Sequence, residues 1–326
     1  MVISAESAGR TLEASEIHAT VARALGRIEL DGRRVLAVIP DHTRSGPTGT
    51  FFRAISDALL PRAKNIDFLI ALGTHPPMSE EKINQLLQIS AAERAERYGA
   101  VRVFNHRWND PGALKQVGTL SQKRVEELSG GRLGIEVPVL INGMVLDYDH
   151  LIICGPVFPH EVVGFSGGHK YLFPGIAAPQ VINFTHWLGA MVTNPMINGT
   201  PDTPVRAAVE AAADLVPVPR SLIAYVVEGS DTRGVFAGPV REAWAAAVEL
   251  SRQLHIVYRD RPYQTVLACA PAMYDDIWTA GKCMYKLEPV VADGGTLIIY
   301  APHIDEVSYS HGTVLDEVGY HVRDYF

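Results

Sequence analysis

The sequence has few cysteines, no excess of basic residues and no long hydrophobic run. Its three cysteines, Cys154, Cys269 and Cys283, are widely spaced, which argues against a disulfide framework and against a cysteine-based zinc site. A formal net charge of −7 leaves no basic surplus for displacing counterions from nucleic acid. The longest apolar stretches, such as 222–227 and 266–272, have the length of a strand and are too short to span a bilayer.

A targeting segment and the common metal or phosphate motifs are also missing. Residues 1–30 mix charged and small residues and lack the apolar core of a signal peptide. There is no H-E-x-x-H zinc motif and no Walker loop. These absences predict a cytoplasmic protein with neither a nucleic-acid nor a membrane partner. Its 326 residues are enough for one large domain or two ordinary ones.

Short apolar runs alternate with helical patterns along the chain. The runs are nearly continuously apolar, as expected of strands buried on both faces of a parallel sheet. This alternation predicts an α/β fold with mostly parallel sheets. The predicted strands are 35–39, 66–72, 101–104, 150–154, 222–227, 265–270 and 296–300, and the clearest predicted helices are 14–25, 51–60, 80–87, 205–215 and 242–254.

The alternation breaks near residues 255–262, where a long amphipathic helix ends and Arg-Asp-Arg-Pro precedes a new strand. We therefore expect two α/β domains, 1–255 and 256–326, with the active site in the cleft between them. Polar clusters follow four predicted strands of the first domain. Because ligands of open α/β sheets bind at the carboxyl ends of the strands, these clusters are expected to converge on one crevice.

The first two clusters each allow two interpretations. In D-H-T-R, Asp41 and Arg44 could hold an anion, or the segment is a polar loop in which Ser45 or Thr50 caps the next helix. In G-T-H-P-P, His75 precedes two prolines that stiffen the loop. A stiff loop suits a general base, although His75 could equally be a structural histidine at a rigid turn.

The segment from His160 to His186 combines histidines, a glycine-rich turn and Lys170. Its glycines let the backbone approach a ligand closely or adopt positive φ. The cation, hydroxyls and imidazoles around them suit a phosphorylated or metal-bearing ligand. The alternative is that His169 and His186 are buried histidines with satisfied hydrogen bonds.

A fourth motif spans 274–286. A helix is expected to start there, with Asp275 or Asp276 as its N-cap. Lys282 then faces an anionic substrate. The alternative is an ordinary amphipathic helix with Trp278 in the core and Lys282 in solvent. Ser79 is the predicted N-cap of the helix at 80–87.

Together the four motifs resemble the nickel-dependent lactate racemase family. The resemblance runs from about Asp41 to the C-terminus and preserves the order of the motifs. It rests on D-x-T-R, on G-T-H, on H-x-x-x-G-F-S-G-G-x-K and on a histidine sixteen residues after Lys170. Any one of these motifs alone would be unspecific, whereas four in order with matching spacing are specific.

The resemblance implies a nickel-pincer nucleotide cofactor, a pyridinium-3-thioamide-5-thiocarboxylate mononucleotide that carries nickel. It implies that Lys170 is the covalent tether, that His186 is the nickel ligand and that His75 and His160 are the acid/base pair. Further residues are implied to bind the cofactor, namely Asp41, Thr43, Arg44, Ser166, Gly167 and Gly168. The residues implied to contact substrate are Arg44, Trp278, Thr279 and Lys282.

The implied activity is racemisation or epimerisation of a 2-hydroxy acid by reversible hydride transfer. The cofactor carries the hydride step, and one histidine on each side of the substrate serves its hydroxyl proton. The implied partners are the small-molecule substrate and the cofactor-synthesis enzymes, and a homo-oligomer is possible. Two alternatives are a hydrolase or lyase that uses the same histidines with a loosely bound divalent metal, and a non-catalytic protein that binds a nucleotide or phosphorylated metabolite. The ordered motifs favour the racemase.

The sequence departs from the lactate enzymes at several positions. Trp278-Thr279 replaces a Tyr-Gln pair, which predicts a 2-hydroxy acid other than lactate. His169 and Tyr171 flank the tether lysine where the lactate enzyme has small or aliphatic residues, and His169 has no assigned role. Because the sequence stops at Phe326, we expect the family's final helical segment and a substrate-contacting tryptophan to be missing, through truncation or in a short variant.

Overall fold

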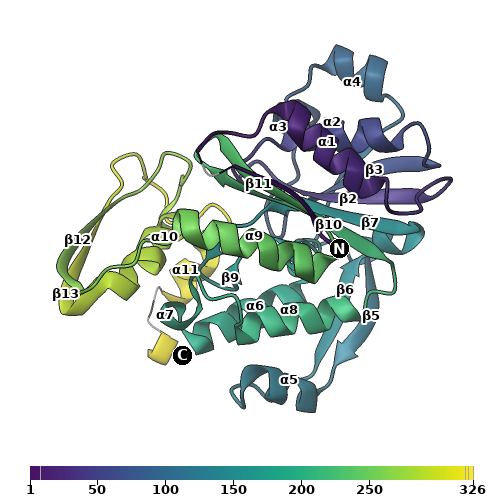
Figure 1. The fold of residues 1–326 in the computed structure, drawn as a ribbon. Helices are drawn as coiled ribbons and strands as arrows, with labels where there is room; N and C mark the ends of the chain where they lie inside the picture. Colours follow the sequence, from purple (N-terminus) through teal and green to yellow (C-terminus); the bar gives the residue numbers. More distant parts are fainter. Residues whose placement is uncertain (8, 320, 322, 326) are drawn as a thin grey trace.

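A seven-stranded sheet forms the centre of the computed structural model, which describes residues 1–7, 9–319, 321 and 323–325 (Figure 1). The strand order is β1-β11-β10-β7-β2-β3-β4. Neighbours from β10 to β4 are parallel, and β11 is antiparallel to both β10 and β1. The mostly parallel α/β fold is therefore confirmed. The strands are β1 (Ile3–Glu6), β2 (Arg34–Pro40), β3 (Asn65–Ala71), β4 (Val103–Asn105), β7 (His150–Pro156), β10 (Arg220–Glu228) and β11 (Asp231–Gly238).

Each central strand divides its side chains between two hydrophobic cores. In β2, Val35, Ala37 and Ile39 pack into one core, while Leu36 and Val38 pack into the other. This alternation explains why the strand is apolar throughout. Helices α1 (Ala14–Leu25), α2 (Thr48–Leu59), α3 (Glu80–Leu86) and α4 (Ala91–Tyr98) cover the first face, and α5 (Gln122–Ser129), α6 (Pro179–Val192), α8 (Pro204–Asp214) and α9 (Val240–His255) the second.

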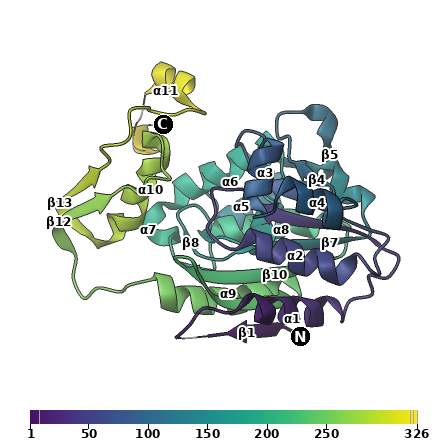
Figure 2. The ribbon, with the colours of Figure 1, turned by 90° about the horizontal axis from the view of Figure 1, so that it is seen from above.

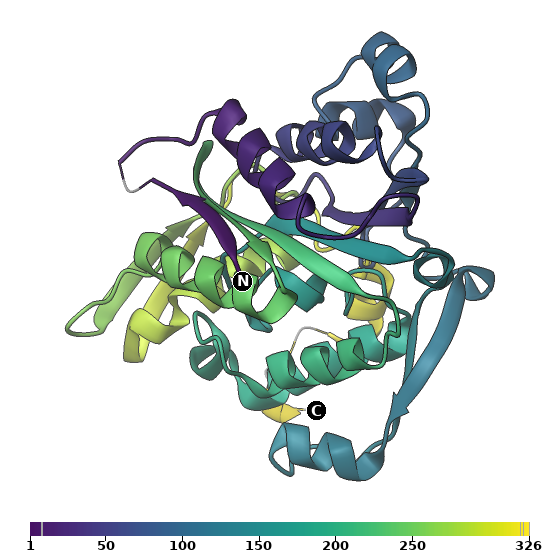
Figure 3. The same cartoon turned by 45° about the vertical axis from the view of Figure 1, so that its right-hand side comes forward.

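Two small hairpins lie outside the large sheet. Strands β5 (Leu114–Leu120) and β6 (Val137–Asn142) are antiparallel and extend to one side, with α5 at their far end (Figures 1 and 3). Strands β8 (Pro159–His160) and β9 (Gly164–Phe165) form a very short hairpin directly after β7. The short helices η1 (Pro111–Ala113), η2 (Gly143–Asp147), η3 (Gly168–Tyr171) and α7 (Asn194–Ile197) complete this part of the chain.

The last seventy residues project from the body beyond α9 (Figure 2). Here β12 (Tyr263–Cys269) and β13 (Val291–Tyr300) form a two-stranded parallel sheet, with α10 (Ile277–Leu287) and η4 (Glu288–Val290) between them and α11 (Gly312–Val318) and η5 (Arg323–Tyr325) after them. Apolar side chains on this sheet are open to solvent, such as Leu267 at 61% and Tyr300 at 58% exposure. Among the described residues, no helix has both the length and the apolarity needed to cross a membrane.

Local predictions were mostly accurate where the periodicity was strong. Helix α1 has the predicted bounds, and the Ser79 hydroxyl caps α3 by accepting from the Lys82 N–H. The suggested capping of the second helix by Ser45 or Thr50 is wrong, because α2 begins at Thr48 after Pro47 with no side-chain cap. Pro47 at this position presets the backbone, so the helix starts earlier than predicted.

Candidate active site

The carboxyl ends of β2 and β3 bring Asp41 and His75 together. These strands are adjacent and parallel, so the residues that follow them meet at one edge of the sheet. His75 Nδ1 lies 2.5 Å from Asp41 Oδ2. Although burial alone would raise the pKa of Asp41, hydrogen bonds from His75 and Thr43 hold it below its ordinary value. An ionised carboxylate only accepts hydrogen bonds, so His75 donates from Nδ1 and keeps an electron pair on Nε2.

Thr43 and Arg44 belong to the same loop. The Thr43 hydroxyl and N–H both donate to Asp41 Oδ1, at 2.6 and 3.1 Å. The half-buried Arg44 guanidinium lies 5.9 Å from the ring centroid of Phe158, near the β8–β9 hairpin. Its charge lowers the pKa values of His160, Lys170 and Lys282. Arg44 is therefore close enough to His160, Lys170 and Lys282 for its charge to affect all three groups.

His160 is buried at the end of β8, with 6% of its surface exposed. Its Nδ1 accepts the Val162 N–H at 3.1 Å, so the neutral ring carries its proton on Nε2. Burial is the main reason that the pKa of His160 lies well below its ordinary value, and the cations Lys170, Arg44 and Lys282 lower it further. Glu161 opposes them. The two predicted acid/base histidines thus have opposite ring hydrogen bonding.

Glu161 is a site residue that the sequence reasoning missed. Its carboxylate lies 3.7 Å from His160 Nδ1 and 3.5 Å from Lys282 Nζ. Burial alone would raise the pKa of Glu161, yet His160 and Lys282 hold it far below the usual range. The only available signal was a carboxylate directly after His160, and its partner Lys282 lies more than a hundred residues further along the chain.

Two glycines of the glycine-rich loop, residues 164–168, cannot be replaced without a clash. Gly164 has a φ of 86°, and a Cβ there would lie 1.8 Å from the Thr200 carbonyl oxygen. Gly167 has a φ of 77°, and its Cβ would lie 2.5 Å from a Val157 methyl group. Both the positive φ and the close packing therefore require glycine. Gly168 follows with a φ of 60° and packs against Trp244.

Arg206 of α8 and Trp244 of α9 hold the back of this loop. Arg206 donates to the carbonyls of Phe165 and Gly167, and Trp244 Nε1 donates to that of Ser166 at 2.8 Å. The guanidinium also stacks on the indole, 4.2 Å from the ring centroid. The carbonyls of three successive residues, 165–167, thus accept hydrogen bonds from α8 and α9.

The Ser166 hydroxyl is turned into the protein. It donates to the Pro156 carbonyl at 3.1 Å and accepts the Phe158 N–H at 3.0 Å. The residue is 3% exposed. Ser166 therefore joins β9 to the end of β7 and helps to shape the loop.

Lys170 projects from η3 beyond the glycines and is partly exposed. In the part of the chain that the structure describes, its amine has neither a hydrogen bond nor an ion pair. Burial lowers the pKa of Lys170 to about 7, and Arg44 and Lys282 contribute to this. A lowered pKa raises the share of neutral amine near neutral pH, and the neutral amine is the form that a lysine needs to act as a nucleophile.

His169, next to Lys170, belongs to an ionic network with Glu210 and Arg220. Its Nδ1 lies 2.7 Å from Glu210 Oε2, and its Nε2 accepts from Arg220 Nε at 2.9 Å. Both ring nitrogens are thus engaged, and the residue is 2% exposed. The alternative of a buried, satisfied histidine is correct for His169, which anchors η3 to α8 and β10.

His186 of α6 is different, because only one of its ring nitrogens is engaged. Nδ1 lies 2.7 Å from the Ile182 carbonyl oxygen and donates to it, so Nε2 keeps a free electron pair. The ring is open to solvent, yet surrounding protein lowers its pKa. Within the described ranges, no group of three or more His, Cys, Asp or Glu side chains is arranged to hold a metal ion.

Trp278 and Thr279 lie four and three residues before Lys282 in α10, so each neighbours Lys282 on the helix surface. Asp276 caps this helix and binds the Thr279 N–H and hydroxyl at 2.7 and 2.5 Å, which confirms Asp276 as one of the two proposed caps. The partly buried Trp278 ring packs edge-on against His311, 4.7 Å away. Lys282 is ion-paired with Glu161. The alternative of an ordinary amphipathic helix with Lys282 in solvent is therefore wrong.

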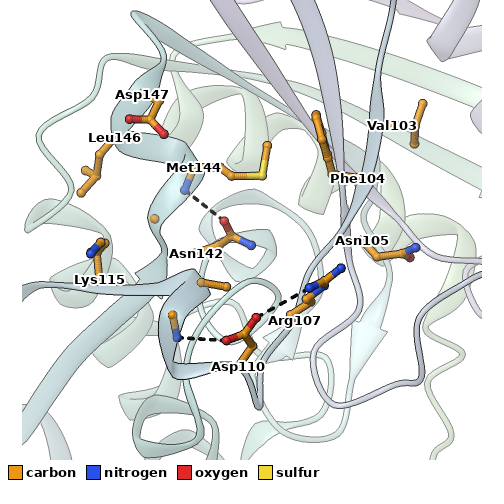
Figure 4. Close-up of a pocket in the computed structure, with 13 residues that line it drawn as sticks. Val103, Phe104, Asn105, Arg107, Asp110, Lys115, Asn142, Met144, Leu146 and Asp147 are labelled. Carbon is orange, nitrogen blue, oxygen red and sulfur yellow. Dashed lines mark hydrogen bonds and ion pairs between the residues drawn. The ribbon is translucent and has the colours of Figure 1, made fainter.

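Among the other histidines, His106 is buried with both ring nitrogens engaged. His106 Nε2 donates to the Ala177 carbonyl at 3.1 Å, and its Nδ1 accepts from Asn142 Nδ2 at 3.2 Å. Asn142 lies on the floor of a separate surface cavity of about 680 Å³ between β4 and the β5–β6 hairpin (Figure 4). There Asp110 contacts Arg107 and the Gly112 N–H. The cavity residues that Figure 4 joins by dashed lines are thus already paired with each other.

Comparison with known proteins identifies the family of this chain. Residues 5–198 match the model of the lactate racemase N-terminal domain, which is more than half of the chain. The chain belongs to the lactate racemase family. It is 24% identical over 279 residues to the lactate racemase of Thermoanaerobacterium thermosaccharolyticum and 26% identical over 288 residues to that of Lactiplantibacillus plantarum.

These alignments include 84% and 82% of this chain but only 61% and 59% of the two lactate racemases. The chain thus spans about three fifths of the length of these relatives. Among solved structures, a Thermotoga maritima protein is similar over 98% of this chain and 79% of its own, with 32% identity and a TM-score of 0.86. The lactate racemase apoprotein of T. thermosaccharolyticum shares the fold, with a TM-score of 0.69 and 22% identity over 86% of this chain and 66% of its own.

Proposed function

We propose that the protein interconverts the stereoisomers of a 2-hydroxy acid, using a nickel-pincer nucleotide attached to Lys170. Membership of the lactate racemase family supports this activity. The observation that carries the proposal is the state of Lys170. An unpaired amine with a pKa of about 7 lies in one electrostatic environment with Arg44 and Lys282 and close to a buried histidine.

The residues present fit the proposed cofactor. Lys170 offers a free amine for the covalent bond, and His186 offers a free Nε2 held in orientation by the Ile182 carbonyl. Imidazole is a suitable nickel ligand. One protein imidazole is enough only if the other nickel ligands come from the cofactor. When bound, the cofactor would supply the ring that accepts and returns the hydride.

The acid/base work then belongs to His75 and His160. His75 Nε2 has an electron pair ready to accept the substrate hydroxyl proton, and Asp41 stabilises the imidazolium that forms. His160 serves the opposite enantiomer. Arg44 and Lys282 hold the substrate carboxylate as it is presented to either histidine.

Other residues shape the space around these groups. Gly167 and Gly168 allow close approach of the loop, and Ser166 acts through the loop backbone. Asp41 and Thr43, in the loop after β2, contact the cofactor in this proposal. Trp278 and Thr279 line the substrate side, and their size and polarity favour a 2-hydroxy acid other than lactate. The cofactor-synthesis enzymes are the partners that this proposal requires.

Mass spectrometry and nickel analysis test the cofactor. The protein is co-expressed with the cofactor-synthesis enzymes, and an adduct on Lys170 with one bound nickel is expected. A Lys170→Arg variant, which keeps a cation but offers no acylable amine, is the matched control. An unmodified Lys170 without nickel in the wild-type protein would refute the proposal.

The loaded enzyme tests the histidines. His75→Ala and His160→Ala should each abolish racemisation and still retain nickel, because neither residue is a proposed ligand. A panel of optically pure 2-hydroxy acids, read by loss of optical purity, identifies the substrate. Full activity in either variant would count against the two-base scheme.

A further inference from the structure

Glu161 lies between the proposed base His160 and the proposed substrate contact Lys282. It sits in the β8–β9 turn, and its side chain is 12% exposed. Its two carboxylate oxygens have different partners. Oε2 lies 3.7 Å from His160 Nδ1, and Oε1 lies 3.5 Å from Lys282 Nζ. None of the four motifs included this residue in a functional role.

The ring of His160 needs such a neighbour. Nδ1 accepts the Val162 N–H, which leaves the neutral proton on Nε2. A base that takes a substrate proton on Nε2 must instead carry its other proton on Nδ1, and that proton needs an acceptor. The Val162 N–H cannot accept. The Glu161 carboxylate, already facing Nδ1, can do so after a small approach, and catalytic hydrogen bonds are often long before substrate binds.

The charges around His160 make an anion necessary. Four cations act on His160 or Glu161: Lys170 from η3, Arg44 from the loop after β2, and Lys282 and Lys286 from α10. The charge of Glu161 also acts to raise the pKa values of Tyr274 and His186. Of the groups that act on His160, Glu161 alone favours its charged form, whereas burial and the cations oppose that form.

We propose that Glu161 is the positioning carboxylate of His160, accepting its Nδ1 proton when His160 acts as a base, and that it holds Lys282 in place at the same time. The arrangement parallels Asp41 and His75, so each base has its own carboxylate. In the proton transfer the substrate O–H bond breaks, an N–H bond forms on Nε2, and the Nδ1 proton stays between His160 and Glu161. The role of His160 rests on the proposed function, whereas the contact with Lys282 does not.

The contact with Lys282 is testable in the protein without cofactor. Glu161→Gln keeps the shape of the side chain and removes its charge, so the Lys282 amine loses the anion that favours its charged form. Acetylation at pH 8, mapped by mass spectrometry, should rise about threefold or more at Lys282 relative to the exposed Lys123 of the same molecule. Glu161→Asp, which keeps the charge, should label close to wild type, and the exposed Glu136→Gln should change nothing.

Two results of this labelling would overturn the pairing. One is unchanged acetylation of Lys282 in Glu161→Gln. The other is an equal rise in Glu161→Gln and Glu161→Asp, which would show that the shape of Glu161 matters rather than its charge. The melting temperature of each variant, measured alongside, identifies any variant that is not folded.

The contact with His160 is tested in the loaded enzyme. For Glu161→Gln we expect kcat to fall about tenfold or more, because the charged imidazole is no longer stabilised. KM should stay level or rise, because Lys282 loses the carboxylate that holds it in place and favours its charged form. Glu161→Asp should recover part of kcat. A rise in KM with unchanged kcat would refute the role toward His160, whereas inactivity of the wild-type enzyme would refute only the proposed function.

Discussion

Four histidines of the site region differ in the hydrogen bonds that their ring nitrogens make, and these bonds decide which nitrogen can accept or donate a proton. They are His75, His160, His169 and His186. Asp41 leaves His75 with a free Nε2, and the Ile182 carbonyl does the same for His186. His169 has both nitrogens engaged and is therefore structural. The motifs predict roles for His75, His160 and His186, but they do not assign the ring nitrogens, because several hydrogen-bond partners of the four rings come from other segments of the chain.

The hydrogen bond between Asp41 and His75 gives a first prediction. In Asp41→Asn the amide can still contact the ring, but it no longer stabilises an imidazolium and can favour the wrong ring tautomer. We expect kcat to fall by about 10²- to 10⁴-fold with substrate binding largely kept. Steady-state kinetics of the loaded enzyme measure this.

The double variant Asp41→Asn with His75→Ala provides the control. If Asp41 acts only through His75, the double variant is no slower than His75→Ala alone. An additive loss would contradict the dyad, because it would show that Asp41 contributes to the rate independently of His75.

The lowered pKa of Lys170 predicts a specific pH dependence of stability. Folding disfavours the charged amine, whose pKa is about 7 in the folded protein and about 10.4 in the unfolded chain. The cost to stability is therefore complete below pH 7 and disappears as the pH rises toward 10. Lys170→Met should stabilise the cofactor-free protein at pH 7, and the gain should shrink progressively up to pH 10.

Urea unfolding of both proteins at several pH values measures this gain. Lys64→Met, at a surface position, should show no such pH dependence. A gain for Lys170→Met that is constant from pH 6 to pH 10 would mean that packing, not the charge of the amine, is responsible.

Among the elements, the glycine-rich loop 164–168 shows how much of a site a sequence pattern can predict. Its glycines are visible in the sequence, and the structure gives the reason for them at Gly164 and Gly167. The groups that hold the loop, Arg206 and Trp244, come from α8 and α9 and look like ordinary helix residues in the sequence. Strand runs with continuous apolar character were predicted, whereas the edge strand β1 and its neighbour β11 were missed because they mix polar and small residues.

Arg206 gives a prediction for this element. In Arg206→Met the carbonyls of Phe165 and Gly167 lose their donor, and Glu210 loses a buried cation. We expect a loss of about 3–5 kcal/mol in unfolding free energy and reduced attachment of cofactor to Lys170. Arg241→Met is the matched control, since this more exposed arginine also pairs with Glu210 and should cost below about 1 kcal/mol. Equal losses in the two variants would contradict a specific role in the loop.

For the whole molecule, the α/β class followed from the alternation of strands and helices, but the strand order did not. Adjacency of β2 and β3 is what joins Asp41 to His75, and it depends on long-range packing that no local pattern encodes. The same holds for the contact of α10 with the β8–β9 turn. We propose that residues 1–255 and 256–326 are separate domains whose contacts include Glu161 with Lys282 and Asn194 with Tyr285 and Glu288.

Limited proteolysis tests this division. Arg259 is exposed in the connection between α9 and β12, and the following Arg261 precedes a proline that blocks trypsin. Brief trypsin treatment of the native protein should therefore cleave after Arg259 and leave a folded fragment of the first domain. Arg259→Gln should resist this cleavage. Early cuts elsewhere, with the bond after Arg259 intact, would contradict the division.

The opposite ring hydrogen bonding of His75 and His160 has a consequence for the two directions of the proposed reaction. With the two histidines as the proposed acid/base pair, the resting protein offers the substrate an acceptor from His75 and an N–H donor from His160, so the two enantiomers would meet unequal surfaces. Enantiomers have the same free energy in solution, so kcat/KM must be equal in both directions whatever the protein does. The asymmetry can therefore be expressed only as a matched pair of differences, with the enantiomer that binds more tightly also turning over more slowly.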